Sequence, residues 1–152
     1  MRRRRMDIKR RKRSIVPTDA NMMESVIIDT GGACSGRTCH GGWACIVRIQ
    51  RIGANATEHS GSVPASTSSN RMELTAVIEA LNTIQDRLYD IQLVSASEYV
   101  VDGINRWRHI WRENRWITST KTPVLNVDLW QTIDELTEQH CIRCTLKVSC
   151  FK

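Results

Sequence analysis

The sequence has 152 residues, of which 41% are hydrophobic and 25% are charged, a composition typical of one globular domain rather than of a disordered chain. No apolar run approaches the roughly 20 residues that cross a bilayer. No apolar stretch follows the basic start, as it would in a secretory signal. These features exclude a membrane protein and predict an intracellular one, in the cytoplasm, the nucleoid or the nucleus.

The net charge of +6 is unevenly distributed. Residues 1–13 carry nine Arg or Lys side chains and one acid, a net charge of +8, whereas all other residues together sum to −2. We expect residues 1–23 to be a disordered basic tail and linker, and residues 24–152 to form the folded domain. Such a tail suits nucleic-acid phosphate, an anionic surface or a nuclear import receptor, or it is a solvated segment without a dedicated partner.

The folded region is predicted to begin with strands. Residues 25–29 are a short apolar run typical of a buried strand, and the glycine-rich stretch 31–36 predicts a turn. Strands over 42–50 and 54–63 would follow, joined by a short turn. This pattern predicts a meander of antiparallel strands.

The second half alternates between helices and strands. The polar cluster at 66–70 offers caps for a helix that reaches about residue 86. The remaining expected elements are a strand, two helices and a closing strand, over residues 91–94, 97–108, 127–140 and 141–148. A meander followed by alternating units predicts a mixed sheet with helices packed on its faces.

The six cysteines are expected to be reduced thiols, because no secretory signal precedes them. His140, Cys141, Cys144 and Cys150 form a candidate cluster, because two cysteines separated by two residues recur in zinc sites. However, positions i and i+3 of a strand point to opposite faces, so Cys141 and Cys144 are poorly placed to share one metal ion.

Several motifs in register resemble one known family. They are Gly31-Gly-Ala-Cys-Ser-Gly36, Gly41-Gly-Trp-Ala44, Asn70-Arg-Met-Glu-Leu74, Ser97-Glu-Tyr-Val100, Gly103-Ile-Asn-Arg-Trp107 and Pro123-Val-Leu-Asn-Val-Asp-Leu-Trp130. In this order and spacing, from about residue 25 to 148, the chain resembles a bacterial-type ribonuclease H (type 1). The resemblance implies the α/β ribonuclease H-like fold, a five-stranded mixed sheet flanked by helices. It also implies hydrolysis of the RNA strand of an RNA/DNA hybrid.

The family's reaction depends on four acids that hold two divalent ions, Mg²⁺ or Mn²⁺, roughly 4 Å apart. The resemblance places the first-strand Asp on Gly31, the helix Glu on Glu73 and the fourth-strand Asp on Ala96. The last acid and the family's final helix fall beyond Lys152, so we expect both to be missing. Glu73 is then the only retained catalytic and metal-binding acid, and we expect no productive metal binding.

Two nearby acids leave an alternative open. Asp29 shares a strand face with Gly31 but lies about 7 Å further back. Glu98 follows Ala96 by two residues and is expected to begin a helix. A weak or divergent ribonuclease H that uses Glu73 with Asp29 or Glu98 is therefore the second hypothesis.

The resemblance also assigns groups that contact nucleic acid. In this family, backbone amides and small polar side chains near the first turn and the first helix read the minor groove of the hybrid, whose 2′-hydroxyls distinguish RNA from DNA. The matching positions are Cys34, Ser35, Gly36, Arg37, Ser69 and Asn70.

A second set of residues resembles the family's basic protrusion, which holds the DNA strand. It consists of Arg106, Trp107, Arg108, Trp111, Arg112, Arg115 and Lys121, with Trp116 nearby. Arg and Trp together can bind phosphate and stack on bases. Alternatively the tryptophans are packing residues, since Trp107 and Trp111 share a helix face, while the arginines still face solvent.

The sequence therefore predicts a nucleic-acid-binding ribonuclease H-like protein, for RNA/DNA hybrid or structured RNA, that has lost two-metal endonuclease activity. Without the final helix, apolar surface should be exposed on that side, where a protein partner could cover it. The third hypothesis is a structural module whose tail alone touches nucleic acid.

Overall fold

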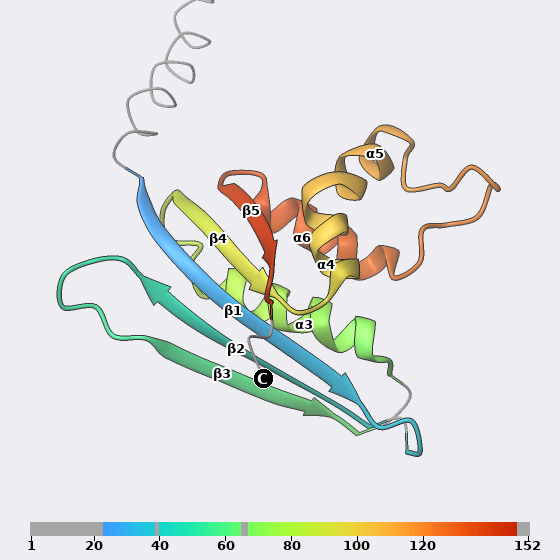
Figure 1. Ribbon diagram of the computed structural model, residues 1–152. Coiled ribbons are helices and arrows are strands. Elements are labelled where there is room, and N and C mark those ends of the chain that lie inside the picture. Colours follow the sequence, from blue (N-terminus) through green and yellow to red (C-terminus); the bar gives the residue numbers. More distant parts are fainter. Residues whose placement is uncertain (1–22, 39, 65–66, 149–152) are drawn as a thin grey trace, which may run out of the picture.

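The computed structural model describes residues 23–38, 40–64 and 67–148 (Figure 1). Nearly all of the expected basic tail lies outside the described residues, and so does Cys150. Within these ranges, none of the helices combines the length and the hydrophobicity that a bilayer span requires.

Five strands form one mixed sheet in the order β3-β2-β1-β4-β5. The strands are β1 (Glu24–Cys34), β2 (Gly41–Ile49), β3 (Thr57–Val63), β4 (Tyr89–Ser95) and β5 (Cys141–Leu146). The β1–β2 and β2–β3 pairs are antiparallel, whereas β1–β4 and β4–β5 are parallel. This topology confirms the mixed sheet that the element order predicts.

The first strand is longer than expected. The predicted turn at 31–36 is wrong for its first half, because Gly31, Gly32 and Ala33 continue β1 and pair with Ala44, Trp43 and Gly42 of β2. Sheet pairing satisfies their backbone groups, so the glycines do not need to turn the chain. The third strand begins at Thr57 rather than at residue 54.

The helices are α3 (Ser69–Asn82), α4 (Glu98–Asp102), the π-helical turn η1 (Gly103–Trp107), α5 (Arg108–Glu113) and α6 (Val127–Thr137). The hydroxyls of Ser68 and Ser97 cap α3 and α4 by accepting from Arg71 N–H and Val100 N–H. The single helix expected over 97–108 is instead widened at η1, where a Cβ on Gly103 would overlap the Trp130 ring.

The core lies between one face of the sheet and the helices. Helix α3 packs on β1 and β2 (Figure 1), α4 and η1 lie against β5, and α6 packs on α3. Alternate side chains of β1 and β4 point into it, as expected for strands with one buried face. Its fully buried members include Val26, Ile28, Leu74, Val77, Leu81, Ile91, Leu93, Trp130 and Ile133. On the other face, Ile27, Ile46 and Val94 are only half-buried.

Candidate functional site

The end of β1 lies directly against the first turn of α3. A Cβ on Gly32 would overlap backbone atoms of Met72 and Glu73, so only glycine permits this approach. This close approach places Glu73 beside the C-terminal half of β1.

The Glu73 side chain is half-buried, and its Oε2 atom is buried without a hydrogen-bond partner. Desolvation raises the pKa of Glu73, and the nearby backbone N–H of Gly32 opposes that rise. A buried carboxylate oxygen without a partner costs free energy unless a donor or a cation satisfies it. Glu73 therefore combines a raised pKa with a buried oxygen that has no hydrogen-bond partner.

The two expected acid positions beside Glu73 carry no carboxylate. A Cβ on Gly31 would meet nothing within 4 Å, so the space for a side chain there is open. Ala96 is exposed directly after β4. Thr30 and Ser95 are the last paired residues of the parallel strands β1 and β4, and Gly31 and Ala96 directly follow them. Of the three positions to which the family resemblance assigns acids in this part of the chain, Glu73 carries a carboxylate, whereas Gly31 and Ala96 do not.

The donor set does not fit a pair of Mg²⁺ or Mn²⁺ ions. Asp29 is bound to Arg48, with Oδ2 2.6 Å from Nη1, and Glu98 is exposed in the first turn of α4. Among residues 23–38, 40–64 and 67–148, no group of three or more His, Cys, Asp or Glu side chains could hold a metal ion. Two dications in close proximity need several carboxylates, and the described residues do not supply them.

The turn after β1 and the start of α3 form one polar surface. Cys34 Sγ donates to the carbonyl of Thr67 at 3.4 Å, which ties the turn to the residues before α3. Ser35 Oγ accepts from the N–H of Arg37 and Thr38, each at 3.4 Å. The structure thereby gathers the predicted groove-contacting residues beside the Glu73 site: Cys34, Ser35, Gly36, Arg37, Ser69 and Asn70. All of these except Cys34 are exposed.

Most cations of the predicted protrusion are also exposed. Arg106, Arg112, Arg115 and Lys121 face solvent, and the loop after α5 stands out from the body of the domain (Figure 1). The guanidinium carbon of Arg106 lies 5.0 Å from the ring centroid of Trp107. This part of the segment presents positive charge and aromatic surface together.

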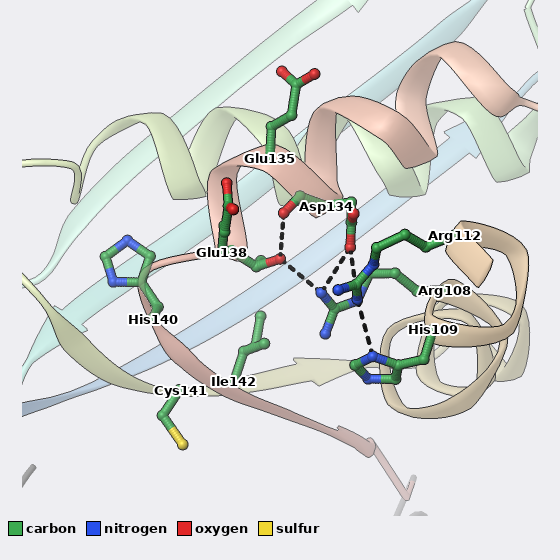
Figure 2. A pocket seen from close by; sticks show the side chains of 10 residues that line it. Arg108, His109, Arg112, Asp134, Glu135, Glu138, His140, Cys141 and Ile142 are labelled. Carbon is green, nitrogen blue, oxygen red and sulfur yellow. Dashed lines mark hydrogen bonds and ion pairs between the residues drawn. The ribbon is translucent and has the colours of Figure 1, made fainter. Parts of the chain in front are cut away.

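Arg108 does not belong to this surface. The residue is only 6% exposed, and Nη1 donates to Asp134 Oδ1 at 3.1 Å and to Thr137 Oγ1 at 2.9 Å (Figure 2). Burial lowers its pKa, and the contact with Asp134 opposes that shift. The expectation that the arginines of this segment face solvent is therefore wrong for Arg108, because α6 supplies a buried counter-charge.

The tryptophans pack on one another. The Trp111 ring centroid lies 6.3 Å from that of Trp107, 6.5 Å from Trp116 and 5.4 Å from Trp130. Trp111 and Trp116 pack against the core, whereas Trp107 remains 39% exposed. The packing alternative thus describes Trp111 and Trp116, whereas Trp107 packs on Trp111 and is still partly exposed to solvent.

Comparison with known proteins shows the family of this chain. The sequence model of the RNase H family matches residues 23–147. The chain belongs to the RNase H family.

Individual relatives support the same assignment. The ribonuclease H of Zymomonas mobilis is 42% identical over 127 residues, which cover 84% of this chain and 78% of that protein. LC9-RNase H1, described as a type 1 RNase H with the type 2 active-site motif, superposes with a TM-score of 0.68 at 27% identity. The match covers 84% of this chain but only 65% of the LC9-RNase H1 chain. LC11-RNase H1, solved in complex with an RNA/DNA hybrid, shares the fold with a TM-score of 0.56 at 20% identity.

In this RNase H domain a hydrogen-bond network links the start of α3 to the start of α6 and to α4. Arg71 donates to Asn126 Oδ1 at 3.2 Å and binds both carboxylate oxygens of Asp128, at 3.1 and 2.8 Å. Tyr99 Oη accepts from Asn126 Nδ2 at 3.1 Å and from Trp130 Nε1 at 2.9 Å. Sequence reasoning missed this network, and the only signal for it is that these residues lie within the shared motifs.

The cysteines of β5 lie in different environments. Cys144 is buried, and burial raises its pKa to about 12, whereas Cys141 is exposed. The side chain of His140 accepts from the backbone N–H of Tyr89 at 3.1 Å. This agrees with the expectation that the spacing of Cys141 and Cys144 does not suit one shared metal ion.

Proposed function

We propose that this chain binds nucleic acid, as RNA/DNA hybrid or structured RNA, and does not cleave it by two-metal chemistry. The observation that carries the proposal is the arrangement of Gly31 and Ala96 beside Glu73, at positions where the family resemblance places two acids. With those carboxylates absent, the described part of the chain lacks the charge needed to hold two dications.

Binding is supported by what surrounds this site. The polar surface at the β1–β2 turn and the start of α3 offers the exposed small polar side chains of Ser35, Ser69 and Asn70, which are suited to a minor groove. The exposed cations Arg106, Arg115 and Lys121 offer phosphate contacts. The hybrid bound by the structurally similar LC11-RNase H1 makes the same class of nucleic acid the first choice of ligand for this chain.

A second candidate function is weak ribonuclease H activity that depends on Glu73. The buried, unpartnered Oε2 of Glu73 favours it, because such an atom is suited to a cation or a donor from a ligand. In that case Asp29 would have to release Arg48, or Glu98 would have to approach the site.

One experiment separates the two functions. An end-labelled RNA/DNA hybrid is incubated with the chain and with Glu73→Ala, in Mg²⁺ and in Mn²⁺, with the Zymomonas mobilis ribonuclease H as positive control. Binding is followed by fluorescence anisotropy and cleavage on a denaturing gel. Binding without cleavage supports the proposal, whereas cleavage that Glu73→Ala abolishes would replace it with the second function.

The third hypothesis, in which only the tail touches nucleic acid, is tested by deleting residues 1–13. The proposal expects the shortened chain to retain binding to the hybrid. Complete loss of binding, in protein that gives the circular dichroism spectrum of the full chain, would assign the interaction to the tail.

A further inference from the structure

We propose that nucleic acid binds at the Glu73 site without a divalent cation. This inference rests on the proposed function and concerns the same site. A cluster of carboxylates repels a phosphate unless bound cations neutralise it, because like charges in close proximity raise the free energy of the complex. Where most of that negative charge is absent or already neutralised, the phosphate needs no cation to approach.

On the two elements that pack against α3, β1 and α6, two acids are already paired with arginines. Asp29, two residues before Gly31 and on the same strand face, is paired with Arg48 at 2.6 Å. Asp128 is bound by Arg71 through two contacts, the shorter at 2.8 Å. Each of these carboxylates therefore carries its own positive partner, and neither adds much repulsion at the site.

The approach to the site is also open. A Cβ on Gly31 would meet no atom within 4 Å, and Ala96 is exposed, so no side chain at these two positions fills the space beside Glu73. Arg37 is exposed in the turn that follows β1, where it adds positive charge. A phosphate at this surface faces the carboxylate of Glu73, and Glu98 lies exposed to water.

The matched variant places a carboxylate at both positions beside Glu73, as Gly31→Asp with Ala96→Asp. The open space at Gly31 and the exposure of Ala96 predict that this variant folds. A charge-matched control carries Ala54→Asp with Ala56→Asp. Both control positions are exposed between β2 and β3, at the opposite end of β2 from the residues that pair with Gly31 and Ala33.

The affinity of each full-length protein for a fluorescent RNA/DNA hybrid is measured by anisotropy in EDTA and in Mg²⁺, at matched ionic strength. A gel confirms that the hybrid stays intact. For the unmodified chain and the control we expect Mg²⁺ to leave binding unchanged or to weaken it by about twofold, since cations compete for phosphate. For the matched variant we expect Mg²⁺ to strengthen binding by about tenfold, because its new carboxylates repel phosphate until they bind the metal.

The opposite signs of the Mg²⁺ effect make the outcomes distinct. If Mg²⁺ strengthens binding by the unmodified chain about as much as by the matched variant, the inference is wrong while the proposed function stands. If the matched variant responds like the control, nucleic acid does not reach the Glu73 site, and the inference fails as well. If the unmodified chain binds no hybrid in either buffer, the proposed function itself is lost.

Discussion

Asp134 on α6 forms a buried ion pair with Arg108: Oδ1 lies 3.1 Å from Nη1, and only 16% and 8% of the two side chains are exposed. Removing one partner of a buried pair leaves an uncompensated charge in the interior. We expect Asp134→Ala to lower the free energy of unfolding by about 3–5 kcal/mol. Urea denaturation followed by circular dichroism measures the change.

The matched control is Arg108→Met, which removes the buried charge and keeps much of the side-chain volume. Its cost should be clearly smaller, because Asp134 keeps an ion pair with Arg112 at 3.2 Å and remains partly accessible. If both variants lose the same small amount of stability, the ion pair contributes little to the folded state, and its burial carries no large energetic penalty.

The exposed and buried cations of the predicted protrusion should differ in their effect on nucleic-acid binding. We expect Arg115→Ala and Lys121→Ala each to weaken binding of RNA/DNA hybrid and to reduce the slope of log affinity against log salt by about 1, as for a lost phosphate contact. Arg108→Met should leave that slope unchanged, since Arg108 is buried. Anisotropy titrations at several salt concentrations test this, and an equal slope for all variants would contradict it.

The adjacent glycines of β1 should respond in opposite ways to alanine. We expect Gly32→Ala to lower the free energy of unfolding by about 2 kcal/mol or more, because its Cβ would overlap the backbone of Met72 and Glu73. Gly31→Ala should be neutral or stabilise by about 0.5–1 kcal/mol, because its Cβ has free space and alanine costs less conformational entropy than glycine. Thermal denaturation of the two variants provides the comparison, and equal melting temperatures would count against the close packing of α3 on β1.

Glu73 should make stability depend on pH. Burial raises its pKa in the folded protein, so the native state binds the proton more tightly than the unfolded chain does. Its contribution to stability therefore falls as pH rises from the ordinary carboxyl pKa through the raised one. We expect Glu73→Gln, which keeps an acceptor for Gly32 N–H, to gain stability relative to the unmodified chain as pH rises through this window.

The difference in stability between the two proteins is measured by urea unfolding at a series of pH values from about pH 4 to pH 8, which begins near the ordinary carboxyl pKa. Asp128→Asn is a useful contrast, because the contact with Arg71 lowers the pKa of Asp128 and its contribution should be lost as pH falls. A difference between Glu73→Gln and the unmodified chain that stays constant with pH would mean that Glu73 is not desolvated.

The sequence by itself determined the order of strands and helices and hence the mixed sheet, since residue periodicity reports which face of an element is buried. The sequence also shows that Gly31 and Ala96 occupy two positions to which the family resemblance assigns acids. Its errors are local: the turn assigned to Gly31 and Gly32 is strand, and the helix after Ser97 contains a π-helical turn.

Only the tertiary structure decided which charged residues are buried and which are exposed. Arg108 and Arg112 look alike in the sequence, yet one is buried against Asp134 and Thr137 while the other remains exposed. Likewise, the contact of Arg71 with Asp128 joins residues 57 positions apart. Spacing along the chain indicates which face of a helix a side chain occupies. The atom that it meets depends on how another element packs, which is set by the fold as a whole.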